Sequence, residues 1–159
     1  AMDIQKDELF PAISPIGYSA DKRSSTENKM RKTMKSDMRK PWGELFFLDS
    51  FGNELSHEEA DRYADPLEML RLAPSATNAQ PWRVVKKQNV YHFFETHKKN
   101  ASEEEKMIKK VDLGIALSHF HQTALEQGLV GQFKKMDNTG INIPENTTYI
   151  ISWEMEKSI

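Results

Sequence analysis

A long predicted helix in the C-terminal half constrains the fold more than any other feature of this sequence. Ser102 predicts its start, because a serine side chain caps the first free amides, and the glutamates at 103–105 complement the helix dipole. Gly128 suits the C-terminal stop. Apolar or small residues occupy most faces between positions 113 and 125. We therefore expect a central helix, ending at about Gln127, that is buried on several sides.

Apolar residues at alternating positions predict strands on both sides of this helix. Residues 82–85 and 90–95 form a predicted hairpin, and residues 130–136 and 147–155 follow the helix as two further strands. One more strand is expected within residues 10–18. Its two prolines place it at the edge of a sheet, because proline cannot donate a ladder hydrogen bond.

Serine caps also predict two helices in the N-terminal half. The first begins at Ser24 or Ser25 and runs to about Asp37. Its predicted buried stripe consists of methionines one turn apart, Met30, Met34 and Met38. The second begins with the capping box Ser56-x-x-Glu59 and runs to Leu72, with a break near Pro66.

Basic residues dominate the region from Lys22 to Lys40, where eight of them face only Glu27 and Asp37. Such an excess suits an anionic ligand. A nucleic-acid partner is not expected, because no aromatic residues are interleaved with the cations and the chain as a whole carries a net charge of -2.

Length and composition restrict the class of protein. The 159 residues, 38% hydrophobic and 29% charged, fit one domain, placed at residues 2–159. The absence of cysteine excludes disulfides, thiolate metal sites and a cysteine nucleophile. His119 and His121 point to different helix faces, so no metal site is predicted. No apolar run approaches the roughly 20 residues that span a bilayer, and we expect a cytoplasmic protein that contacts no membrane.

The stretch Ala-Pro-Ser-Ala-Thr-Asn-Ala-Gln-Pro-Trp, residues 73–82, resembles the flavin-contacting segment of the FMN-dependent nitroreductase-like family. Pro74, Ser75 and Ala76 are small and rigid enough for a flat ring to approach the backbone, and Ser75 and Asn78 can hydrogen-bond a pyrimidine edge. The alternative to flavin contact is a purely structural role. A polar connection between a helix and a strand, with a packed Pro-Trp pair, would also explain each of these residue types individually.

Two further segments are similar to the same family. Residues 111–129 resemble its long central helix, which forms much of the subunit interface, so the resemblance implies a homo-oligomer. Residues 15–18 followed by 39–42 resemble the end of a nitroreductase domain, where basic residues approach the flavin phosphate. By this resemblance Arg39 and Lys40 would bind the phosphate. A solvated basic helix end is the alternative for both.

The order of these segments resembles the subgroup of the family that carries two halves in one chain. Residues 2–50 are similar to the end of a first half and residues 51–159 to a second half, so the front portion is expected to be missing. An Arg-Arg-Ser motif, which in the family contacts the flavin, is not found near the N-terminus.

The resemblance implies an α+β fold with a central, mostly antiparallel sheet flanked by helices and a long buried central helix. It also implies an oxidoreductase that passes a hydride from NAD(P)H through FMN to a nitroaromatic, a quinone or a similar small-molecule acceptor, with no catalytic side chain of its own. The alternative is a non-catalytic relative that keeps the fold and the dimer interface without a complete flavin site.

Overall fold

The computed structural model describes residues 16–18 and 21–156, and its centre is a five-stranded sheet in the order β1-β2-β3-β5-β4. The strands are β1 (Phe46–Leu48), β2 (Trp82–Lys87), β3 (Val90–Thr96), β4 (Gly131–Lys134) and β5 (Thr147–Met155). Only β1 and β2 pair in parallel, and the other neighbours are antiparallel. The predicted α+β class, the hairpin, the mostly antiparallel sheet and the last strand are confirmed.

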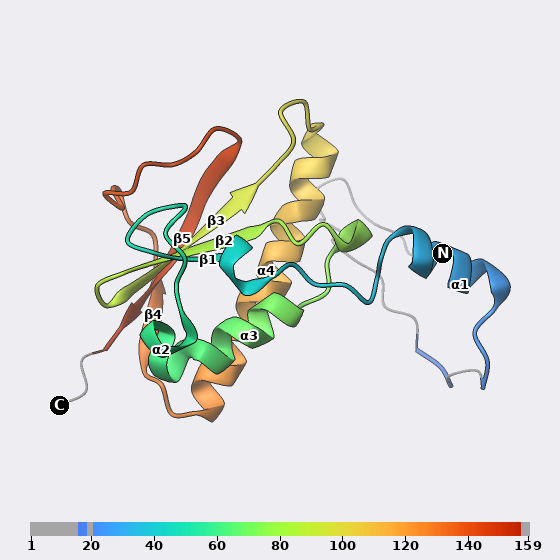
Figure 1. Ribbon diagram of the computed structural model, residues 1–159, viewed down its shortest axis with the longest axis horizontal. Helices are drawn as coiled ribbons and strands as arrows, with labels where there is room; N and C mark the ends of the chain where they lie inside the picture. The colour runs from blue at the N-terminus through green and yellow to red at the C-terminus, as the bar shows by residue number, and fades with distance from the viewer. Residues whose placement is uncertain (1–15, 19–20, 157–159) are drawn as a thin grey trace, which may run out of the picture.

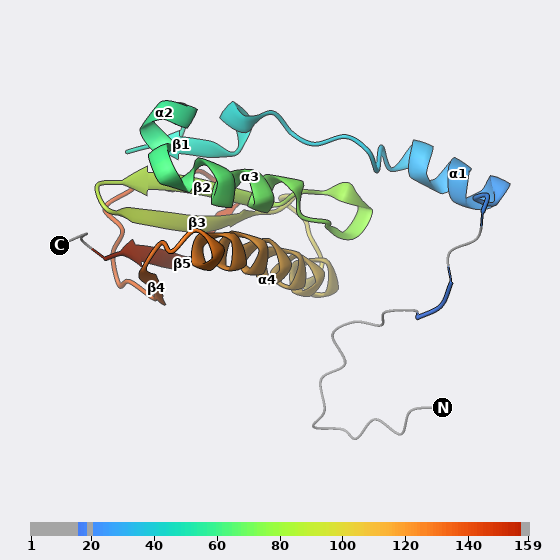
Figure 2. The same ribbon diagram turned by 90° about the horizontal axis from the view of Figure 1, so that it is seen from below.

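The two longest helices of the main body, α3 (Ala64–Leu72) and α4 (Glu103–Glu126), pack against each other and against one face of the sheet (Figures 1 and 2). This face carries the main core, which includes Trp82, Val84 and Phe93. The opposite face buries the smaller cluster of Phe47, Val85 and Phe94 under connecting segments that contain Phe51 and Ile141. The helices therefore cover one face rather than flanking the sheet on both.

Helix α4 begins as predicted, with a capping box in which Ser102 accepts from the Glu105 N–H. Its buried residues form one stripe at helical spacing, namely Asp112, Leu113, Ala116, Phe120 and Ala124. Ile108 and Leu125, on other faces of the helix, are exposed. The prediction of burial on several sides is wrong for the single chain, because the sheet and α3 both lie on the same side of α4.

The predicted helix from Ser56 to Leu72 is divided. Its capping box is confirmed, but α2 (His57–Ala60) ends at Asp61, which has a positive φ of 52°. A short 3-10 turn, η2 (Asp61–Tyr63), then leads into α3. The break therefore lies before Pro66, which occupies the first turn of α3, where a missing N–H costs no helical hydrogen bond.

Helix α1 (Ser25–Thr33) has the predicted Ser24 cap but ends before Asp37. The prediction that its methionine stripe is buried is wrong: Met30, Met34 and Met38 are 53%, 39% and 59% exposed. Figures 1 and 2 give the reason, since α1 lies beyond the end of the sheet and away from the other described helices. The edge strand expected within residues 10–18 falls mostly outside the described residues, and residues 16–18 are not a strand.

Candidate functional site

The segment that follows α3 forms a compact loop before β2. A 3-10 turn, η3 (Ala76–Asn78), stands at its centre, and Thr77, Asn78 and Gln80 adopt left-handed φ values of 52°, 55° and 48°. The Gln80 N–H donates to Ser75 Oγ at 2.9 Å, which closes the loop on itself. We call residues 74–81 the Pro-Ser-Ala loop. Pro74 and Ala76 are exposed on it.

Helix α4 anchors this loop through a buried carboxylate. Asp112 is 4% exposed, and its Oδ1 accepts from the Ala76 N–H at 2.9 Å. Its other oxygen, Oδ2, is buried without a hydrogen-bond partner among the described residues. Burial raises the pKa of Asp112, against the opposing effect of the Ala76 hydrogen bond. The loop backbone is therefore held by the central helix.

The segment from Lys35 to Lys40 is tied to the loop by side-chain amides. Asn78 Nδ2 donates to the carbonyls of Lys35 and Met38 at 2.7 and 2.9 Å. Gln80 Oε1 accepts from the Lys40 N–H at 2.7 Å, and Gln80 Nε2 donates to Asn78 Oδ1 at 3.1 Å. Both ends of the Asn78 amide are thus used within the chain, and Asn78 holds the two segments together.

Arg39 has the same bracing role in this structure. Its guanidinium donates to the carbonyl of Leu72 at 3.3 Å and to the carbonyls of Ser36 and Met38 at 3.0 and 2.9 Å. It also reaches Asn78 Oδ1 at 3.3 Å. These acceptors carry no net charge, and together they fix the position of the Arg39 guanidinium.

Lys40 and Arg83 form a pair of neighbouring cations next to the loop. Burial lowers the pKa of both, the positive charge of Arg83 lowers the pKa of Lys40 further, and Glu44 partly offsets these effects. Arg83 alternates along β2 with Trp82 and Val84, whose side chains face α4, so its own side chain lies on the opposite face of the sheet. Two adjacent, partly desolvated cations favour an anion between them.

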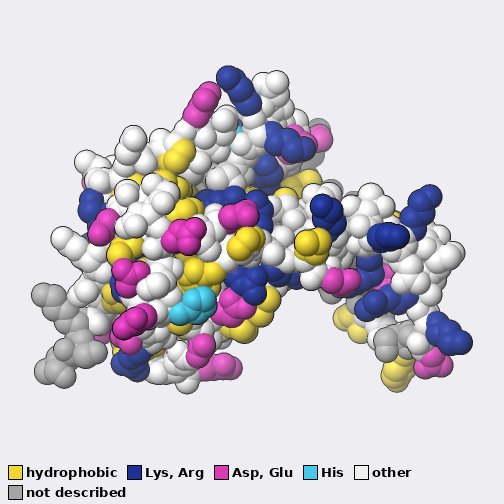
Figure 3. Space-filling model, in the orientation of Figure 1, with side chains coloured by type: hydrophobic (Ala, Val, Ile, Leu, Met, Phe, Trp, Pro, Cys, Tyr) yellow, Lys and Arg dark blue, Asp and Glu magenta, His cyan; other side chains and the backbone are white. Residues whose placement is uncertain are grey.

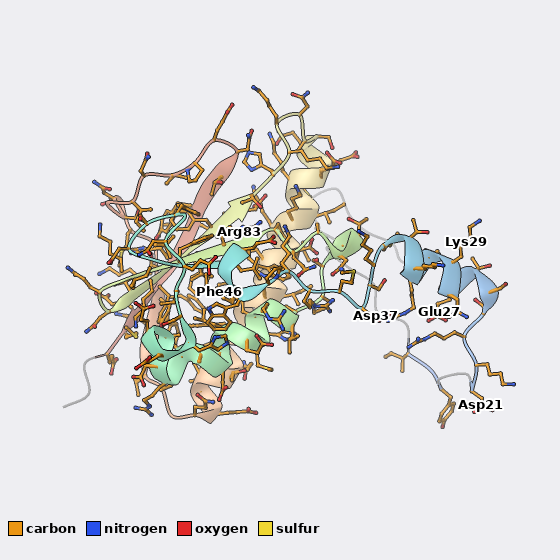
Figure 4. The ribbon with its side chains drawn as sticks, viewed as in Figure 1. Asp21, Glu27, Lys29, Asp37, Phe46 and Arg83 are labelled. Atoms are coloured by element: carbon orange, nitrogen blue, oxygen red, sulfur yellow. The ribbon has the colours of Figure 1, made fainter. Side chains whose placement is uncertain are left out.

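Figure 3 shows Lys and Arg side chains in the middle of the viewed face, in the area where Figure 4 labels Arg83. Sequence reasoning did not assign Arg83 a role. The available signal was its position, since it is the first charged residue after the Pro-Ser-Ala loop. Arg71, in contrast, is neutralised by Glu68, which it contacts with two hydrogen bonds of 2.6 Å.

The structure brings the predicted site residues together from two parts of the chain. Direct or shared hydrogen bonds join Arg39, Lys40, Ser75 and Asn78 through Gln80, and Pro74 and Ala76 lie beside them. In the part of the chain that the structure describes, no group of three or more His, Cys, Asp or Glu residues could hold a metal ion. None of the described helices has both the length and the apolar character needed to cross a membrane.

Comparison with known protein families identifies the family of this chain. The family model described as "Putative TM nitroreductase" matches residues 1–124. The chain belongs to this nitroreductase family. A crystal structure of a nitroreductase, itself described as putative, from Thermotoga maritima is similar at 28% sequence identity, with a TM-score of 0.48. The alignment covers 74% of this chain and 42% of that one, so this chain spans less than half the length of that nitroreductase. No curated protein matches the chain.

Proposed function

We propose that this member of the nitroreductase family binds FMN and passes a hydride from NAD(P)H to a nitroaromatic, a quinone or a similar acceptor. The observation that carries the proposal is the placement of Lys40 and Arg83 next to the Pro-Ser-Ala loop. Their charges are only partly offset by Glu44, so they suit a phosphate dianion, which pairs with fixed cations through charge-assisted hydrogen bonds.

The residues of the loop suit the ring of the flavin. Pro74 and Ala76 offer small exposed surfaces, and Ser75 Oγ, which accepts from Gln80, keeps its own proton for donation. In this proposal Arg39 and Asn78 do not contact the flavin directly. They fix Lys40 relative to the loop, and Asp112 fixes the Ala76 backbone from the other side.

The chemistry divides between cofactor and chain. When bound, FMN supplies the hydride acceptor and donor, and the protein needs no nucleophile for that step. The contribution of the chain is to bind the phosphate, to hold the loop backbone still and to leave one side of the ring open to the substrate.

The alternative is a non-catalytic relative without a complete flavin site. One observation favours it: Asn78 already uses both ends of its amide within the chain. In that case the Pro-Ser-Ala loop would serve only to join α3, β2 and the segment from Lys35 to Lys40.

Reconstitution with FMN separates the two functions. Purified protein is incubated with FMN, desalted and scanned for the flavin band near ~450 nm, and NADH is then added without oxygen to follow its bleaching. A retained band that NADH bleaches supports the oxidoreductase. A colourless protein after desalting supports the non-catalytic relative and contradicts flavin binding.

Two matched variants locate the site. Arg83→Gln removes one cation of the proposed phosphate pair and is expected to lower flavin retention. Lys29→Gln removes an equal charge from α1, which Figure 4 shows away from Arg83, and is expected to retain flavin like the unaltered chain. Equal retention by both variants would contradict the assignment of Arg83.

We also infer self-association through the exposed side of α4. Ile108, Ile115 and Leu125 are 50%, 36% and 53% exposed on a helix whose other side is buried. Light scattering is expected to give more than the monomer mass, and a monomer at all concentrations tested would contradict this inference.

A further inference from the structure

A groove of about 420 Å³ lies on the other side of the Pro-Ser-Ala loop from Arg83. It is lined by the loop, by the end of β3 with the residues that follow it, and by α4. Its lining includes Thr77, Pro81, Thr96, Lys98 and Lys109. Because Lys109 belongs to α4, this groove lies on the helical side of the sheet, whereas Arg83 points from the opposite face.

The cations of the groove are unpaired within the described residues. Neither Lys98 nor Lys109 has a carboxylate within ion-pair distance there, although other lysines of the same region do, such as Lys106 with Glu103 at 2.6 Å. Lys98 is exposed at the rim and Lys109 is half-buried. Burial raises the pKa of Glu95 and Asp112, and the positive charge of Lys109 partly offsets this effect on both carboxyls.

The walls of the groove are preorganised. Thr96 Oγ1 donates to the Pro81 carbonyl at 3.0 Å, and the Thr96 N–H donates to the same oxygen at 2.8 Å, which joins β3 to the loop. Thr77, held at a φ of 52°, also lines the groove and is exposed. The groove thus combines two lysines without an ion pair, the hydroxyl of Thr77 and an apolar proline wall, in a volume within the roughly 300–1,000 Å³ of small-molecule sites.

We propose that this groove binds the phosphate of a small-molecule ligand, with Lys98 and Lys109 as the pairing cations and the hydroxyl of Thr77 as a further donor. The proposal goes beyond flavin binding at Lys40 and Arg83 and does not require it, because Lys109 lies on the helical side of the sheet and Arg83 points from the opposite face. Free phosphate, FMN and the dinucleotide NADH share the chemistry that this groove recognises.

Calorimetric titration of flavin-free protein with inorganic pyrophosphate tests the groove. The titration is made in the Arg83→Gln variant as well as in the unaltered chain, which separates pyrophosphate beside Lys40 from pyrophosphate in the groove. Saturable binding is expected to persist in Arg83→Gln. Adding Lys98→Gln or Lys109→Gln is expected to weaken it about tenfold, the loss of one charge-assisted contact.

Lys110→Gln is the matched control, since Lys110 neighbours Lys109 on α4 but does not line the groove. Its affinity should stay within about twofold of the parent protein, a change too small for a lost direct contact. Lys98 is exposed, so its variant keeps the test valid if Lys109→Gln folds poorly. The proposal is overturned if Arg83→Gln shows no pyrophosphate binding, or if the Lys98 variant and a folded Lys109 variant both bind as tightly as the control.

Competition identifies the source of the phosphate. Displacement of pyrophosphate from the groove by NADH assigns it to the hydride donor, displacement by FMN assigns it to the flavin, and displacement by neither assigns it to free phosphate. Failure of flavin binding at Lys40 and Arg83 is seen separately, because the pyrophosphate titration uses flavin-free protein and its result in Arg83→Gln does not depend on flavin retention.

Discussion

Helices α4 and α1 begin alike and end in different surroundings. Each follows a serine whose side chain accepts the N–H three residues later, Ser102 from Glu105 at 3.2 Å and Ser24 from Glu27 at 3.1 Å. Each also carries apolar residues at helical spacing. Yet α4 buries a full stripe, whereas none of the described residues of α1 is buried. Apolar spacing predicts a helix, but burial of that face requires another element at the same place.

The region between α1 and β1 shows a second way of joining a segment to the body. Residues 35–40 are held by hydrogen bonds between the side chains of Asn78, Gln80 and Arg39 and backbone groups rather than by a buried apolar face. The stability of the body should therefore depend on α4 and little on α1. Polar contacts, in contrast, should determine the geometry of the site.

The largest expected effect comes from truncating the stripe of α4. Phe120 is fully buried and packs against Tyr63, Phe93 and Trp153. Phe120→Ala should lower the free energy of unfolding by about 3–5 kcal/mol in urea denaturation, because it leaves a cavity in the main core. Met34→Ala on α1 should change it by less than about 0.5 kcal/mol. A similar loss of unfolding free energy in both variants would contradict the proposed difference between the two helices.

The free energy of unfolding is expected to depend on pH through a buried group of the main body. Helix α1 should not contribute, because it has no buried titratable group. His92 is 3% exposed, and its Nδ1 lies 2.8 Å from Ser152 Oγ. Burial, with a smaller contribution from the positive charge of Lys87, lowers the pKa of His92 from 6.5 to about 4. The unfolded chain therefore takes up the proton first, and stability present above pH 6.5 is lost as the pH falls toward 4.

Urea denaturation at pH 6.5 and at pH 4 measures this loss of stability. The free energy of unfolding is expected to fall by on the order of 2 kcal/mol. Glu95 and Asp112 have raised pKa values and act in the opposite direction, so the comparison is made with His92→Gln, which keeps their contribution. An equally steep pH dependence in His92→Gln would show that another group is responsible.

The smallest expected effect comes from removing the two serine caps one at a time. Ser102→Ala should cost about 1 kcal/mol of global stability, because it removes a cap from a helix that is part of the core. Ser24→Ala should lower the helical signal of α1 in circular dichroism and leave the urea midpoint unchanged. A shift of the midpoint by Ser24→Ala would mean that α1 is packed on the body in solution.

Sequence patterns of neighbouring residues predicted most of the helices and strands. The capping box at Ser56, the serine cap at Ser102 and the existence of β5 depend on neighbouring residues, and all three were predicted correctly. The errors concern what lies next to an element in space. The exposed methionines of α1 and the single buried stripe of α4 depend on the position of other segments, which periodicity does not report.

The candidate site was predictable in part for the same reason. The Pro-Ser-Ala loop is one continuous string, so its residues could be named from the sequence alone. That Asn78 and Arg39 brace residues 35–40, and that Arg83 lies beside Lys40, follows from contacts across more than thirty positions. The roles given to Lys40, Pro74, Ser75 and Ala76 in flavin binding stay predictions, whereas Arg39 and Asn78 are proposed to brace the site rather than to contact the flavin.

The most direct measurement compares FMN with riboflavin, which lacks the phosphate, in a fluorescence titration of the purified chain. If Lys40 and Arg83 bind the phosphate, FMN should bind roughly 10- to 100-fold more tightly than riboflavin, the worth of one or two contacts to a charged group. Lys40→Gln and Arg83→Gln should each reduce this preference, whereas Lys29→Gln should keep it. Equal affinity of the unaltered chain for both flavins, or no change in flavin fluorescence, would contradict the account.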